Sequence, residues 1–134
     1  MKKGFWLVAA GVFAGLFVLE FAIHEVALKG AYEATASVWR SKEQMSQMMK
    51  WMMASYLLVS VFFTWIFVKG YEKGKAGLGQ GIRYGLLMGG LFASDKLVWY
   101  VVLPIPASLM LAWMAGNLVV GLSLGTIAGL LYKN

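Results

Sequence analysis

The stretch ASLMLAWMAGNLVVGLSLGTIAGLLY, residues Ala107–Tyr132, is apolar for longer than the roughly 20 residues that a helix needs to cross the hydrocarbon of a bilayer. Three further stretches qualify in the same way: Gly4–Leu28, Met48–Val68 and Gly81–Leu103. Because lipid offers the backbone no hydrogen-bond partners, each stretch is expected to be helical. The sequence therefore predicts an all-α, polytopic membrane protein in which residues 1–134 form a single domain of four transmembrane helices.

The composition supports a membrane protein and argues against other classes. Of the 134 residues, 60% are hydrophobic and 13% are charged, whereas charged residues make up about a quarter of a soluble domain. The net charge of +6 comes from short segments between apolar stretches and not from one basic face, so nucleic acid is not a predicted partner. The absence of cysteine excludes disulfides, thiolate metal sites and cysteine nucleophiles. The predicted partner is the lipid bilayer.

The ends of the apolar stretches refine this prediction. The start Met1-Lys2-Lys3 resembles a signal peptide, but the apolar stretch that follows is longer than a signal core of about 7–15 residues and contains Glu20. We therefore expect it to be a retained first span. The third connection is only Pro104-Ile105-Pro106, and proline cannot continue a helix, so a sharp reversal is expected there.

The basic residues predict the orientation in the membrane. The termini and the second connection carry Lys2, Lys3, Lys69, Lys73, Lys75, Arg83 and Lys133. The opposite side is expected to hold Lys29, Arg40 and Lys42, with Lys50 near the start of the second span, partly offset by Glu33 and Glu43. Because cytoplasmic segments are richer in lysine and arginine, both termini are expected to be cytoplasmic.

The first connection, residues 29–47, is the only polar segment of any size. It contains Tyr32, Val38 and Trp39, which suit the level of the lipid headgroups. Ser41 and Gln44 fit a capping box that opens the second helix. This connection is interpreted either as a lid or partner surface, or as a stretch along the membrane interface, and the second interpretation is favoured.

The two halves of the chain resemble each other. GLFVLE, residues 15–20, aligns with GLFASD, residues 90–95, and on the same register Ala10 and Ala14 match Gly85 and Gly89. Trp51-Met52 likewise aligns with Trp113-Met114. One interpretation is a duplicated helical hairpin in which the first and third helices run the same way. The alternative is chance similarity between apolar segments.

Glycines recur at every fourth position in the third and fourth spans. They are Gly81, Gly85 and Gly89 in the third, and Gly121, Gly125 and Gly129 in the fourth. Small residues at this spacing let helix backbones approach closely. We expect these two helices to pack on each other through their glycines; the alternative is that one glycine row faces a second copy of the chain.

Polar side chains inside the spans are the candidate functional residues, because they are costly in lipid. The candidate ligand- or ion-binding residues are Glu20, His24, Asp95, Lys96 and Asn117. Counting about 1.5 Å of rise per residue brings Glu20, Asp95 and Asn117 to similar depths in the outer half of the bilayer. This layer is predicted to bind or pass a cation or a small ligand. The alternative is a structural ion pair in which Lys96 locks the first helix to the third.

A metal site is a narrower version of the same hypothesis. Glu20 and His24 lie four residues apart on one helix face, and Met49 and Met52 come at a matching depth. Imidazole and carboxylate suit divalent cations, while thioethers favour soft ions. The alternative is that the methionines only fill space in the packing.

No catalytic residue is predicted, because the sequence lacks the HExxH motif and a phosphate-binding loop after a strand. An enzyme is therefore not expected, and no cofactor can be named. The alternative to ligand binding is a structural or accessory subunit of a larger membrane complex. A homo-oligomer is a further expectation, drawn from the glycine rows.

Several segments resemble small bacterial four-helix membrane proteins: FAIH at residues 21–24, AYEATASVWR at 31–40 and FVKGYE at 67–72. In plan the chain is similar to the DUF1761-type family, which also has a tryptophan in its first outer loop and a glycine-rich third helix. This resemblance implies the bacterial inner membrane and brings no activity with it.

Overall fold

The computed structural model describes residues 3–133, which form helices and short connections without a strand. The four long helices are α1 (Lys3–Phe21), α4 (Met49–Lys69), α5 (Gly77–Val102) and α6 (Ala107–Leu131). The four segments that are long and apolar enough to cross a membrane are Gly4–Ala27, Met49–Lys69, Gly77–Val102 and Ala107–Leu131. The predicted all-α fold with four candidate spans is confirmed, with boundaries within a few residues of those expected.

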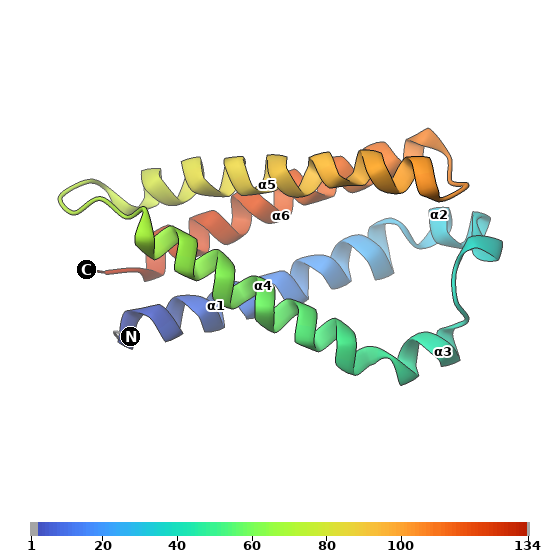
Figure 1. The fold of residues 1–134 in the computed structure, drawn as a ribbon, viewed down its shortest axis with the longest axis horizontal. Coiled ribbons are helices and arrows are strands. Elements are labelled where there is room, and N and C mark those ends of the chain that lie inside the picture. Colours follow the sequence, from blue (N-terminus) through green and yellow to red (C-terminus); the bar gives the residue numbers. More distant parts are fainter. Residues whose placement is uncertain (1–2, 134) are drawn as a thin grey trace.

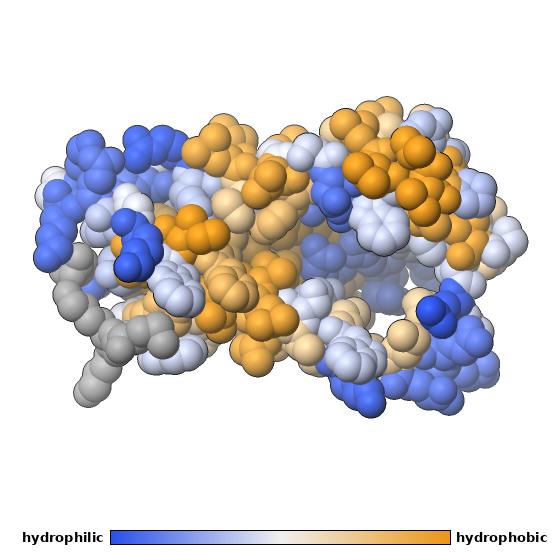
Figure 2. Space-filling model, viewed as in Figure 1, coloured by the Kyte–Doolittle hydropathy of each residue, from blue (hydrophilic) through white to orange (hydrophobic). Residues whose placement is uncertain are grey.

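The long helices alternate in direction, so the start of α1 and the end of α6 lie at the same end of the bundle (Figure 1). A methyl group on Gly4 would lie 3.8 Å from the carbonyl oxygen of Lys133. α6 packs on both α5 and α1, and α1 in turn packs on α4. In Figure 2 an apolar band crosses the middle of the molecule, with hydrophilic atoms gathered towards its ends.

Short helices fill the first connection. They are the π-helix η1 (Ala22–Ala27), α2 (Lys29–Ala34), the 3-10 helix η2 (Ala36–Val38) and α3 (Lys42–Gln47). The predicted capping box of Ser41 and Gln44 is present, but it opens the short α3 and not the long α4, which begins after a turn at Met48. The expected reversal at Pro104–Pro106 separates the end of α5 from the start of α6.

Two apolar cores hold the helices together. The first core joins all four long helices near the chain termini and includes Val12, Phe63, Leu124 and Tyr132. The second core lies at the opposite end, where Ile105, Leu109 and Met110 at the start of α6 are buried. The connection after the first span folds onto this second core through Tyr32, Val38 and Trp39. We call residues 28–39, which cover this end of the bundle, the cap.

Glycines bring α5 and α6 into backbone contact within one chain. A Cβ atom on Gly81 would lie 2.2 Å from the carbonyl oxygen of Gly125, and one on Gly85 would lie 2.3 Å from that of Gly121. Gly129 meets the carbonyl of Gly77 in the same way. We call this row of contacts the glycine seam. No side chain fits between the two helices along it.

Beyond the first core the helices separate. The buried residues of α4 all lie in its second half, between Ser60 and Phe67, and α5 buries nothing after Ala93. Tyr84 ties α5 to α4 near the middle by donating its hydroxyl hydrogen to the carbonyl of Phe63 over 2.7 Å. We call the half of the bundle between this tie and the cap the open half.

The two hairpins are packed differently. α1 and α5 run the same way (Figure 1), as the duplication hypothesis requires. Ala10 and Ala14 of α1 are exposed, however, whereas the matching Gly85 and Gly89 of α5 are buried. α1 instead places Gly11 and Gly15 against the side chains of Ile127 and its neighbours on α6.

Candidate functional site

Two adjoining cavities occupy the open half. The larger has a volume of about 670 Å³, and the smaller has a volume of about 330 Å³. We call them the main crevice and the aromatic pocket. Figure 2 shows the molecule hollowed on this side, with hydrophilic atoms in the recess. The five residues named from the sequence all line these cavities: Glu20, Lys96 and Asn117 line both, His24 lines the aromatic pocket, and Asp95 lines the main crevice.

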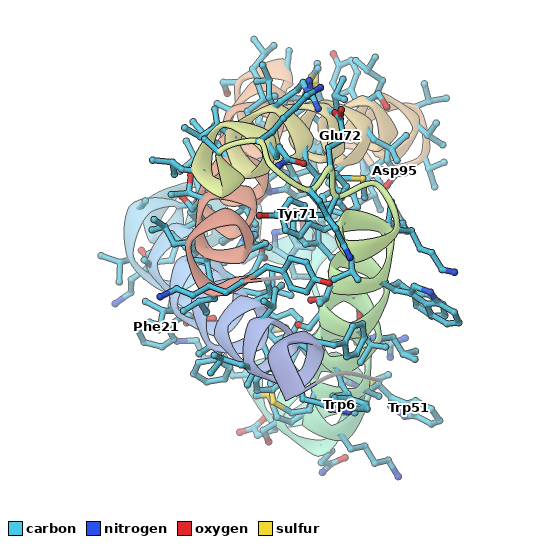
Figure 3. All side chains as sticks on the ribbon, turned by 90° about the vertical axis from the view of Figure 1, so that its left-hand side faces the viewer. Trp6, Phe21, Trp51, Tyr71, Glu72 and Asp95 are labelled. Atoms are coloured by element: carbon cyan, nitrogen blue, oxygen red, sulfur yellow. The ribbon has the colours of Figure 1, made fainter. Side chains whose placement is uncertain are left out.

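All four long helices contribute to the main crevice. Its walls are largely apolar and include Leu16 of α1, Val59 of α4, Phe92 of α5 and Val120 of α6. The side chain of Asp95 is 59% exposed. In the end-on view of Figure 3 it lies at the edge between α5 and α4. The main crevice therefore has apolar walls and a charged rim.

A chain of hydrogen bonds runs along the aromatic pocket. Nε2 of His24 lies 3.0 Å from Oε2 of Glu20, and Nδ1 of His24 lies 2.5 Å from the hydroxyl oxygen of Tyr32. The same hydroxyl oxygen accepts the indole N–H of Trp113 over 2.7 Å. The chain thus joins α1, the cap and α6. We call these four residues the Glu–His–Tyr–Trp relay.

One arrangement of hydrogens satisfies every bond in the relay. An indole nitrogen can only donate, so the oxygen of Tyr32 accepts from Trp113 and its own hydrogen is free to go to Nδ1 of His24. In this arrangement Nε2 of His24 carries the hydrogen that is donated to the carboxylate of Glu20.

The local backbone explains how His24 reaches both partners. His24 lies in the π-helix η1, where the N–H of Leu28 bonds to the carbonyl of Ile23 five residues earlier over 2.8 Å. Such π-helical insertions rotate the residues that follow them and often occur at functional sites. Here the π-helix leads directly into α2, which carries Tyr32 back towards the imidazole.

Tyr32 belongs to the cap, outside the candidate spans. Burial raises the pKa of its hydroxyl above the ordinary value, and the nearby charges of Glu20 and Glu25 act in the same direction, while the hydrogen bond from Trp113 opposes the rise. The hydroxyl therefore stays protonated at neutral pH, as the relay requires.

The charges of α5 form a separate group. Oδ2 of Asp95 accepts the indole N–H of Trp99 over 2.9 Å and lies 3.6 Å from Nζ of Lys96. Within residues 3–133, Lys96 pairs with this neighbour on its own helix and not with Glu20. The expected lock between the first and third helices is therefore absent there. Asn117 donates its amide hydrogen to the carbonyl of Trp113 over 2.7 Å and keeps its side-chain oxygen free.

The expected metal site is not assembled. Met49 and Met52 are 45% and 38% exposed, and neither lines a cavity, because the start of α4 leans away from the other helices. Both nitrogens of His24 are already engaged by Glu20 and Tyr32. Within the described residues, no three His, Asp or Glu side chains gather closely enough to hold a metal ion.

Aromatic residues complete the site, and the sequence analysis did not assign them to it. Tyr32, Trp39, Trp99 and Trp113 all line the aromatic pocket. Two of them stand four residues from a candidate polar residue, since Trp99 follows Asp95 and Trp113 precedes Asn117. A spacing of four residues places each tryptophan on the same helix face as its polar neighbour, and this was the sequence signal that could have assigned both tryptophans to the site. No comparable signal connects Tyr32 or Trp39 to the site.

Comparisons with protein-family models, with curated proteins and with solved structures gave no match to this chain.

Proposed function

We propose that this chain is a multi-pass protein of the bacterial inner membrane, with both termini in the cytoplasm, that binds a small amphipathic ligand in the main crevice. The observation that carries the proposal is the lining of the two cavities. Every polar residue chosen from the sequence faces a cavity in the half of the bundle where the helices separate. Such a mixture of apolar walls and a few polar groups is typical of sites for small organic ligands.

The charges favour a ligand with a positive group. Asp95 and Lys96 balance each other at 3.6 Å. Within the described residues, Glu20 is paired with His24 alone, with Oε2 of Glu20 3.0 Å from Nε2 of His24. A carboxylate in apolar surroundings is stabilised by a nearby cation, so a positively charged ligand group beside Glu20 would improve the charge balance.

The alternative role as an accessory subunit, or as a homo-oligomer, has less support. It was argued from the glycine rows as surfaces for a partner. In the structure both rows face each other along the glycine seam, so neither is free to receive another chain. The long helices also expose many large apolar side chains, as contact with lipid requires.

Native mass spectrometry tests the proposal. The chain is extracted from its own membrane in a mild non-ionic detergent, and metal content is measured on the same sample. We expect a bound organic molecule in the wild type and its loss in Glu20→Gln. The matched control is Glu25→Gln, which removes a carboxylate that is exposed and lines neither cavity. A wild-type chain without a bound molecule, or a molecule retained equally by both variants, contradicts the proposal.

A further inference from the structure

The aromatic pocket is lined by rings from three separate parts of the chain. Tyr32 and Trp39 come from the cap, Trp99 from α5 and Trp113 from α6. The rings of Tyr32 and Trp39 pack edge to face with their centroids 5.5 Å apart, and the centroids of the Trp39 and Trp113 rings are 5.9 Å apart. We propose that this pocket binds a methylated ammonium group carried by an amphipathic ligand. The inference rests on the proposed function, because the apolar part of the same ligand occupies the main crevice.

The rings have no polar hydrogen left for a ligand. Trp39 donates its indole N–H to the hydroxyl of Thr35 over 2.9 Å. Trp99 and Trp113 donate theirs to Asp95 and to Tyr32. What the rings still offer is the negative charge of their faces, which attracts cations and is the usual means of binding quaternary ammonium groups.

The polar groups beside the rings select the same chemistry. A primary ammonium group presents three hydrogens that need acceptors, whereas a fully methylated one presents none. The indole rings that form most of the wall supply no acceptor, and the acceptors Glu20 and Asn117 lie at the junction of the pocket with the main crevice. The carboxylate of Glu20 lies at the junction of the two cavities and supplies the opposite charge.

The junction also explains why the ligand is amphipathic. Glu20, Lys96 and Asn117 line both cavities, so a molecule seated in the aromatic pocket continues past them into the main crevice. There it meets the apolar side chains of Leu16 and Phe92. Two sources supply such a molecule: a phospholipid with a choline headgroup, or a free cationic amphiphile.

Binding of two matched amphiphiles tests the inference. Dodecyltrimethylammonium and dodecylammonium have the same chain and charge and differ in the methyl groups. Each is titrated into the purified full-length chain in a non-ionic detergent, and the complex is quantified by native mass spectrometry. We expect dodecyltrimethylammonium to bind about tenfold more tightly, because the primary ammonium must give up hydrogen bonds to water on entering the ring-lined pocket.

Variants of the rings connect this preference to the pocket. Trp39→Leu and Trp99→Leu are each expected to weaken binding of dodecyltrimethylammonium about tenfold. Trp39→Phe keeps a ring face and is expected to retain most of the binding, which separates loss of the ring from loss of the fold. The control is Trp51→Leu, because Trp51 is 65% exposed on α4 and lines neither cavity. Its binding is expected to equal that of the wild type.

The outcomes distinguish this inference from the proposed function. If the two amphiphiles bind equally and Glu20→Gln weakens both, the crevice binds amphiphiles and only the ammonium assignment is overturned. If neither amphiphile binds, the inference is overturned; the proposed function then fails only if the wild-type chain also carries no molecule from its own membrane. Where dodecyltrimethylammonium is preferred, dodecylphosphocholine is added to the complex. If it displaces dodecyltrimethylammonium, the source is a phospholipid; if it does not, the source is a free amphiphile.

Discussion

Trp113 donates its indole N–H to the hydroxyl oxygen of Tyr32 over 2.7 Å, and the two residues lie 81 positions apart in the chain. This bond fastens the cap to α6 beside the aromatic pocket, which both residues line. The oxygen of Tyr32 is the acceptor in this bond, since an indole nitrogen can only donate.

The first prediction concerns the coupling of these two residues. Trp113→Phe is expected to lower the free energy of unfolding by about 1 kcal/mol, the net contribution of one hydrogen bond, and Tyr32→Phe by about 2 kcal/mol, because the hydroxyl of Tyr32 also bonds to His24. The double variant is expected to lose less than the sum, with a coupling energy of about 0.5–1.5 kcal/mol. Unfolding in a detergent mixture measures all four proteins. Trp51→Phe serves as a control for the loss of an exposed indole, and strictly additive losses would contradict the bond.

The second prediction concerns the glycine seam. Gly81→Ala would place a methyl group 2.2 Å from the carbonyl oxygen of Gly125, so α5 and α6 would have to move apart. We expect a loss of more than about 2 kcal/mol in the free energy of unfolding, because the strain falls on backbone atoms. Gly90→Ala, on the same helix, adds its methyl group to open space and is expected to be neutral or slightly stabilising. Equal losses in the two variants would refute close packing at Gly81.

The third prediction concerns pH and the connection between α4 and α5. Hydrogen bonds and charge from Lys75, with a smaller contribution from Arg83, hold the pKa of Glu72 below its ordinary value. A depressed pKa stabilises the fold above that value, and the stabilisation disappears as the pH falls through the folded-state pKa. The difference in Tm between the wild type and Glu72→Gln is therefore expected to be small at pH 7 and absent at strongly acidic pH.

Salt and a second carboxylate control this measurement. Glu72 is on the surface, so added salt is expected to reduce the difference at pH 7. Glu43→Gln removes an exposed carboxylate from α3 and is expected to leave the pH dependence unchanged. A difference between wild type and Glu72→Gln that grows on acidification would refute the assignment.

The fourth prediction concerns orientation. The chain has no cysteine, so single cysteines can be introduced without removing others. With both termini in the cytoplasm, Ser37→Cys in the cap is expected to react with a membrane-impermeant maleimide in intact cells. Lys73→Cys, in the connection between α4 and α5, is expected to react only after the membrane is permeabilised. The reverse pattern would invert the proposed topology.

The sequence predicted the long helices well, because their length and apolarity are local properties. The reversal at Pro104–Pro106 was equally local, since proline cannot continue a helix. The break at Met48 was not predicted, because α3 and α4 together read as one helical stretch. The closeness of α5 and α6 could be anticipated from the glycine spacing, but that spacing did not reveal whether the partner helix belonged to the same chain.

The sequence could predict how deep in the membrane the candidate residues lie, but not the direction in which each side chain points from its helix. Counting residues along a helix gives the height of a side chain in the membrane, and this brought Glu20, Asp95 and Asn117 together. The rotation of each helix about its axis depends on packing, so Met49 and Met52 were expected beside His24 and lie outside both cavities. The contact of Tyr32 with Trp113 depends on a folded connection and on residues far apart in sequence.

The glycine seam determines which wall of the main crevice can move. Backbone atoms of α5 and α6 interlock along it, so sliding would bring these atoms into steric overlap and separation would lose their close contacts. α4 has no such constraint in the open half, where it buries no side chain before Ser60. The hydroxyl of Tyr84 holds it at one point, the carbonyl of Phe63. Ligands of different bulk would therefore be admitted by a swing of α4 about that hinge, against a partner wall that stays rigid.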